Sequence, residues 1–254
     1  MLTFLEFLPY ITIFIFGITI GSFLNVCIYR IPLGESIVTA PSHCMTCGRK
    51  LKWYDMVPVF SWLVLGGKCR NCKSKISIQY PIIEGVNGIL YVVICAVNGM
   101  EWSSVIYSFM ASSLLVLSII DWRTYEIPFG INVFLFILGI AMTVLDRGNL
   151  VEHLIGMICV SGLLEVLYLV TGGGAIGGGD IKLMFACGLM LGWKLILLAF
   201  FLGCIIGSVV HIIRMAAKKA GRMLAMGPYL SVGILLAALW GNAWISWYLS
   251  LLGL

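Results

Sequence analysis

Charged side chains are scarce in this sequence. Only 11% of its 254 residues are Asp, Glu, Lys or Arg, whereas 61% are hydrophobic and the mean hydropathy is +1.07. A soluble domain is about one quarter charged, and a chain this apolar would expose large hydrophobic patches to water. A bilayer removes that cost. The composition therefore excludes an ordinary soluble protein and predicts an all-α polytopic membrane protein.

A phosphate-binding loop is also lacking. Glycines gather at 172–179, but no strand precedes them and the order G-x-x-x-x-G-K-S/T is absent. The net charge of +5 is explained by membrane topology, so we expect no nucleic-acid partner. No basic region precedes the apolar segment 7–29, which we expect to be a permanent span rather than a removable signal peptide.

Apolar segments recur along the chain and predict about eight transmembrane helices. The predicted spans are 7–29, 82–98, 102–120, 130–145, 152–171, 180–192, 195–213 and 226–252. Segment 180–192 is the weakest, because at about 1.5 Å per residue it is short for a hydrocarbon core about 30 Å thick, so a half-span is the alternative. The predicted parts are a first helix at 1–29, a polar domain at 30–80 and a membrane core at 81–254.

Lys and Arg concentrate on one face of this topology. Of the 16 basic residues, only Arg147 and Lys194 fall on the opposite face. The others lie in four loops and are Arg30, Arg49, Lys50, Lys52, Lys68, Arg70, Lys73, Lys75, Arg123, Lys182, Arg214, Lys218, Lys219 and Arg222. Because basic loops stay in the cytoplasm, this face is predicted to be cytoplasmic and both termini to be outside.

Four of the nine cysteines lie in the polar segment, in two C-x2-C pairs. Cys44 and Cys47 form one pair, Cys69 and Cys72 the other, with 21 residues between the pairs. Each pair can form a tight knuckle, and two knuckles complete a tetrahedral tetrathiolate site. We predict a structural Zn²⁺, since four protein thiolates leave no open position for catalysis. Free thiols or a redox pair are the alternative.

Two acidic residues stand at the cytoplasmic ends of different predicted spans, and so at equal depth. Asp121 ends the run 118–121, and Asp180 follows three glycines, at 177–179. Two carboxyl groups held about 3 Å apart cannot both ionise, so one keeps a proton while the other acts as a base toward water. The alternative for either residue is an interfacial helix cap, with Lys182 near enough in sequence to pair with Asp180.

Two further acids near the membrane call for a hypothesis, since ionisable residues at this depth are costly. Glu84 follows Tyr80 and Pro81 at the mouth of the second predicted span, where it is a candidate for substrate or cofactor binding. Glu165 lies in the middle of a span near Tyr168. We interpret it as a buried, protonated hydrogen-bond donor rather than a catalytic group.

Several motifs together resemble the type IV prepilin peptidase family. These are GSFLNVCIYRIP at 21–32, the two C-x2-C pairs, VPVFSWL at 57–63, GKC at 67–69 and YPIIE at 80–84. Asp121 followed by Ile127 and Pro128 is similar to the first catalytic motif. The segment GGGDIKL at 177–183 matches the G-x-G-D signature, and MGPYL at 226–230 resembles a late motif of the family. The resemblance covers nearly the whole chain in order.

The resemblance implies an intramembrane aspartyl protease with catalytic residues Asp121 and Asp180. It implies eight membrane helices in the bacterial inner membrane, with the catalytic face toward the cytoplasm. The implied partners are prepilins or pseudopilins, whose short basic leader is removed just before their hydrophobic helix. It also implies methylation of the new N-terminus with S-adenosylmethionine, an activity linked to the cysteine-bearing domain.

The sequence departs from the family pattern at two places. Phe129 follows Ile127 and Pro128 where the family often has another Asp, and 172–176 carries no charged residue before the G-x-G-D motif. Neither departure removes a catalytic aspartate. Two alternatives stay open: a peptidase without methyltransferase activity, and a zinc-containing membrane transporter or assembly factor. The transporter requires a polar path across the bilayer, whereas the ionisable residues lie mostly at one face.

Overall fold

The computed structural model describes residues 2–174, 176–217 and 224–253. It divides into two compact units, Met1–Met100 and Glu101–Leu254. Helices make up both units, and the predicted all-α membrane class is confirmed. Three residues of the predicted basic face, Lys218, Lys219 and Arg222, lie outside the described residues.

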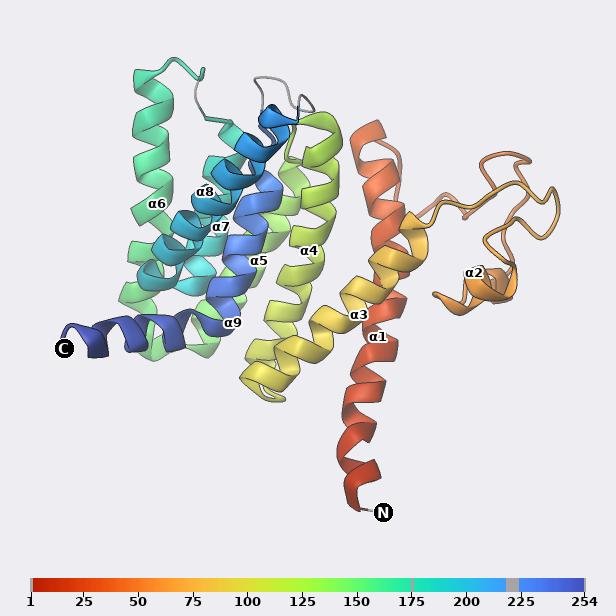
Figure 1. The fold of residues 1–254 in the computed structure, drawn as a ribbon, viewed down its shortest axis with the longest axis horizontal. Coiled ribbons are helices and arrows are strands. Elements are labelled where there is room, and N and C mark those ends of the chain that lie inside the picture. Colours follow the sequence, from red (N-terminus) through yellow and green to blue (C-terminus); the bar gives the residue numbers. More distant parts are fainter. Residues whose placement is uncertain (1, 175, 218–223, 254) are drawn as a thin grey trace. The chain divides into compact units, whose positions relative to one another are not determined.

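The first unit is a helix pair with a long polar loop between its members. Helix α1 spans Leu2–Arg30 and α3 spans Gln79–Asn98; between them lie η1 (Ile31–Leu33), η2 (Trp53–Asp55) and the short helix α2 (Phe60–Val64). Helix α1 packs along α3 (Figure 1), and the buried Asn87 side chain donates a hydrogen bond to the Gly17 carbonyl oxygen at 2.8 Å. At the end of α1, Arg30 donates to the Ala40 carbonyl oxygen at 2.7 Å, which draws the start of the loop against the helix.

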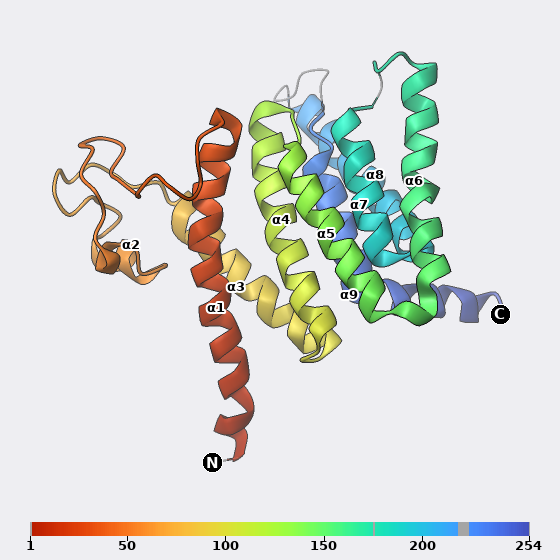
Figure 2. The same ribbon diagram turned by 180° about the vertical axis from the view of Figure 1, so that it is seen from behind.

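The second unit is a helical bundle. Its helices are α4 (Trp102–Thr124), α5 (Phe129–Leu145), α6 (Leu150–Val170), α7 (Gly178–Leu191), α8 (Trp193–Ala216) and α9 (Gly227–Leu251), with the turn η3 at Arg147–Asn149. Helix α7 is enclosed by its neighbours (Figure 2), and Leu183, Met184 and Cys187 on it are fully buried. This burial explains an apolar sequence on a helix that is too short to cross a bilayer alone.

Each of the eight predicted spans is helical, but fewer meet the requirements for crossing a membrane. Among the described residues, six helices are long and apolar enough to span: α1, α3, α4, α6, α8 and α9. Helix α5 is apolar but has 17 residues, and α7 has 14. At about 1.5 Å per residue, α7 covers about 21 Å of a core about 30 Å thick.

Candidate functional site

Asp121 lies in the last turn of α4, with its side chain buried. The helix continues three residues beyond it, to Thr124, and ends where Tyr125 adopts a left-handed conformation with φ 56°. The Oδ2 atom of Asp121 accepts a hydrogen bond of 2.9 Å from the backbone N–H of Gly227, which is the first residue of α9. The carboxyl group of Asp121 is therefore held by the N-terminus of another helix, whose dipole favours negative charge.

Asp180 occupies the first turn of α7, so its carboxyl group also lies at a helix N-terminus. Its Oδ1 atom is buried and has no hydrogen-bond partner within the described part of the chain. A buried carboxyl oxygen without a partner is costly in a finished core. It is the arrangement expected of a group that binds water or substrate.

The structure brings Asp121 and Asp180 together in the second unit, near enough for their charges to interact. The link is made by α9, since α4 and α7 come from separate parts of the chain and both contact it. Two carboxyl groups that interact at close range share protons as a pair.

Two glycines allow close backbone packing at the helix ends that carry Asp121 and Asp180. A Cβ atom on Gly227 would lie 2.7 Å from Asp121 Oδ2, so this position has no room for a side chain. In the G-x-G-D segment, a Cβ on Gly179 would lie 2.8 Å from Ile127 Cβ, whereas one on Gly178 would meet nothing within 4 Å. Packing therefore requires glycine at the last position of the motif before the aspartate, and not at the middle one.

This difference predicts the outcome of a matched pair of variants. We expect Gly179→Ala to reduce hydrolysis by about 10²-fold, because relieving the clash with Ile127 displaces the first turn of α7 and a shift of about 1 Å costs this much. Gly178→Ala should retain activity near that of the native protein. Steady-state peptide cleavage by the two purified variants tests this, and equal activities would contradict it.

Two alternatives drawn from the sequence are wrong. Lys182 does not form an ion pair with Asp180 in the described residues; its ammonium group lies 5.2 Å from the ring centre of Phe129. Glu165 is exposed on the surface of α6 rather than buried as a hydrogen-bond donor. Its neighbours along the helix placed it at membrane depth, but the rotation of α6 turns its side chain away from the core.

The four cysteines of the polar loop meet in the first unit. The Sγ atoms of Cys44, Cys47, Cys69 and Cys72 all lie within 4.8 Å of one another. A tetrahedral ion with Zn–S bonds of about 2.3 Å requires sulfur atoms about 3.8 Å apart, and the Cys44 and Cys72 sulfur atoms are separated by 3.8 Å. The donor set and spacing fit a structural metal ion that is enclosed by four thiolates.

Each pair forms a tight knuckle with the same local hydrogen bonds. The Cys44 N–H donates to the Arg49 carbonyl oxygen, and the Cys69 N–H donates to that of Ser74, each at 2.9 Å. Backbone N–H groups of Cys47, and next of Thr46, lower the pKa of the Cys44 thiol to about 6. These N–H groups therefore favour the thiolate of Cys44, which is the form that binds metal.

Glu84 lies in the first unit and contacts the loop. Its Oε2 atom accepts a hydrogen bond of 2.7 Å from the backbone N–H of Val59, and the residue is 6% exposed. The sequence indicated Glu84 as a candidate for substrate or cofactor binding. The observed contact gives it a structural partner that no local pattern indicated, since the two residues are 25 positions apart.

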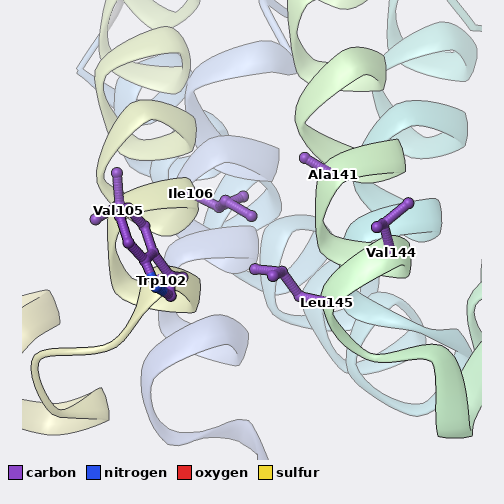
Figure 3. A pocket seen from close by; sticks show the side chains of 6 residues that line it. All are labelled: Trp102, Val105, Ile106, Ala141, Val144 and Leu145. Atoms are coloured by element: carbon purple, nitrogen blue, oxygen red, sulfur yellow. The ribbon is translucent and has the colours of Figure 1, made fainter.

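Two pockets in the second unit lie at the ends of the helices that are far from the carboxyl groups of Asp121 and Asp180. A pocket of about 370 Å³ is lined by Trp102, Val105, Ile106, Ala141, Val144 and Leu145, which are all apolar (Figure 3). Trp102 begins α4, whereas Asp121 is near its end. A second pocket, of about 320 Å³, includes His153, whose Nε2 lies 3.3 Å from Asp146 Oδ2. No sequence motif indicated the pair of His153 and Asp146.

The fold and these two sites define a multi-pass membrane protein with a pair of interacting carboxyl groups and a four-cysteine cluster that can bind metal. A family model for the bacterial peptidase A24 N-terminal domain matches residues 15–98, and the model of the type IV leader peptidase family matches residues 108–212. A Bacillus subtilis protein named prepilin leader peptidase/N-methyltransferase is 33% identical, over 94% of this chain and 97% of its own length. The chain belongs to the type IV leader peptidase family.

Other relatives carry the same name. The protein of Aeromonas salmonicida is 26% identical over 97% of this chain and 96% of its own length. That of Myxococcus xanthus is 33% identical over 82% of this chain, and the match spans 64% of the relative. No solved structure matches this chain. The family predicted from the sequence motifs is confirmed.

Proposed function

We propose that this chain removes the leader peptide of type IV prepilin-like proteins and methylates the new N-terminus. The observation that supports the peptidase is the interaction of Asp121, whose carboxyl group accepts a hydrogen bond from the N-terminus of α9, with Asp180, in the first turn of α7. The names of the relatives supply the substrate class and the second activity. The transporter alternative is not favoured, because the family and the paired carboxyl groups both indicate hydrolysis.

In the proposed mechanism, Asp121 and Asp180 share one proton. The ionised carboxylate takes a proton from water, whose oxygen attacks the carbonyl carbon of the scissile peptide, while the protonated partner donates to the carbonyl oxygen. Collapse of the tetrahedral intermediate returns a proton to the leaving amine and breaks the C–N bond. The buried, unpartnered Oδ1 of Asp180 and the fixed Oδ2 of Asp121 suggest that Asp180 contacts the water and Asp121 sets the geometry.

The cluster of four cysteines supports the proposal of a structural Zn²⁺ ion. Cys44, Cys47, Cys69 and Cys72 would hold it with four thiolates, so it would contribute to folding rather than to the reaction. S-adenosylmethionine is the methyl donor in this proposal and supplies an electrophilic methyl group. Glu84 remains a candidate residue for the site of this methyl donor, where its role would be to position the loop that it binds.

We also propose the eight-span topology, in which α5 and α7 complete the set by packing between longer helices. The excess of Lys and Arg on one side orients that face toward the cytoplasm of a bacterial inner membrane. The basic leader of a prepilin or pseudopilin would wait at this face. Six spans of sufficient length, together with the family, support this arrangement.

Co-expression with a candidate prepilin tests the whole function in one measurement. We expect the mass of the substrate to fall by that of its leader and to rise by about 14 Da, the mass of one methylene group, for each methyl group added to the new N-terminus. Loss of the leader without added mass would support the peptidase-only alternative. An unprocessed substrate, beside a control cleaved by a known family member, would refute the proposal.

A further inference from the structure

Helix α2 presents an apolar face that the described part of the chain leaves uncovered. Phe60, Leu63 and Val64 are 62%, 60% and 82% exposed. Their spacing of three and four residues places them on one side of the helix. Trp53, in the preceding turn η2, is 77% exposed. We refer to these four residues as the apolar face.

The other side of α2 contacts the loop through Trp62, whose side chain is half-buried. The Trp62 side chain donates a hydrogen bond of 3.2 Å to the Ile76 carbonyl oxygen. A Cβ on Gly67 would lie 2.8 Å from the Trp62 ring, so the ring rests directly on the second knuckle. The contact between Trp62 and Gly67, two residues before Cys69, therefore orients α2 relative to the second cysteine pair.

A strained turn sets the position of α2. Val59 has φ 61° and ψ −53°, and Phe60 N–H donates to the Pro58 carbonyl oxygen at 2.6 Å, which closes a three-residue turn. This conformation is rare for a β-branched residue and persists only when the surroundings impose it. The bond between Val59 N–H and Glu84 is the constraint. The strained conformation of Val59 is thus accompanied by a hydrogen bond that joins the start of α2 to α3.

The hydrogen bond between Val59 and Glu84 indicates where α2 lies relative to the start of the membrane helix α3. Glu84 lies five residues after Gln79, where helix α3 begins, which is about 7.5 Å along the helix axis at about 1.5 Å per residue. Amphipathic helices at a membrane surface bury their apolar side about 5–10 Å into the boundary between head groups and acyl chains. In both views α2 lies displaced from the Arg30 end of α1, toward its other end (Figures 1 and 2).

The charge of the loop indicates what kind of surface it meets. The segment 31–78 has seven exposed basic residues, and its two acids are Glu35 and Asp55. The basic residues are Arg49, Lys50, Lys52, Lys68, Arg70, Lys73 and Lys75. Asp55 is paired with Arg70 at 2.7 Å. A basic loop that also exposes aromatic and aliphatic side chains suits a surface of anionic lipid head groups.

We propose that the apolar face of α2 inserts into the lipid head-group region of the membrane that α1 and α3 span. Trp53, Phe60, Leu63 and Val64 enter the lipid, and the surrounding Lys and Arg contact anionic head groups. The metal-binding loop is then a monotopic element that is fixed to the membrane surface at two places, through Glu84 and through lipid. This role is independent of the peptidase activity.

Photo-cross-linking in the full-length protein tests the proposal. Leu63→p-benzoylphenylalanine places the probe in the apolar face, and Met45→p-benzoylphenylalanine is the matched control, because Met45 is 80% exposed on the first knuckle. In nanodiscs, we expect the yield of lipid adduct at position 63 to be several-fold higher than at position 45. The yield at position 63 should also be higher with phosphatidylglycerol than with phosphatidylcholine alone. Metal content per chain confirms that each variant retains the folded loop.

Three results would overturn the proposal. The first is a lipid adduct at position 63 no more abundant than at position 45, in variants with full metal content. The second is cross-linking of position 63 to an added prepilin or to another copy of the chain without any lipid adduct, which would assign the apolar face to a protein partner. Equal yields in the two lipids would refute the part assigned to anionic head groups.

Discussion

Replacing either Asp121 or Asp180 with asparagine is expected to reduce leader cleavage by about 10³-fold or more, since proton transfer by positioned groups contributes about 10²–10⁴-fold. An amide cannot accept the proton from water or hold the shared proton of the pair. Both substitutions nearly preserve side-chain volume, and in Asp121→Asn the amide oxygen could still accept the Gly227 N–H. The fold should therefore survive, and the purified variants are assayed by mass spectrometry of a prepilin.

Glu165→Gln is the matched control. It removes one carboxylate from α6 at a position that is exposed and outside the pair, so cleavage should stay near that of the native protein. Methyl transfer to a substrate whose leader has already been removed should persist in the Asp121 and Asp180 variants, which separates loss of chemistry from loss of fold. Normal cleavage by either aspartate variant would disprove the paired-carboxylate mechanism.

The second large effect is expected from Cys44→Ser combined with Cys47→Ser. Removing two of four thiolates should release the metal, and structural Zn²⁺ in small domains contributes about 10–16 kcal/mol of apparent binding free energy. The loop 30–80 has little core of its own, because its apolar side chains on α2 are largely exposed. Its unfolding should make the loop sensitive to protease while the membrane helices remain intact.

Elemental analysis of the purified protein gives the metal content, and limited proteolysis reports the state of the loop. Cys159→Ala is the matched control, since Cys159 lies on α6 and outside the cluster. It should change neither measurement. Metal content that is unchanged in the double variant would reject the tetrathiolate site.

Local patterns were sufficient for the membrane class, the helices and the cysteine cluster. Every predicted span is helical, because long apolar runs can satisfy their backbone groups in a bilayer only by forming helices or barrels. The observed ends differ by a few residues; α4 extends past Asp121 to Thr124, where Tyr125 closes it. Segment 180–192 was short in sequence, and the structure shows α7 as a short, enclosed helix.

Other features depend on contacts between distant residues. Nothing near Asp121 in the sequence indicates that Gly227, 106 positions later, donates to its carboxyl group. The sequence shows three consecutive glycines before Asp180, but only packing against Ile127 distinguishes Gly179 from Gly178. The exposure of Glu165 likewise depends on how α6 is rotated against its neighbours, which its hydropathy does not reveal.

The amino-acid sequence by itself determined that this is a membrane protein and which family it belongs to, and it predicted the residues of the two sites, because hydropathy, motif order and ligand spacing are read along the chain. Only the tertiary structure decided that the N-terminus of α9 binds the carboxyl group of Asp121, and that Glu84 binds the cysteine-bearing loop instead of standing free. The physical reason is that these contacts arise when helices far apart in sequence pack together, and the free energy of that packing depends on all of their surfaces at once.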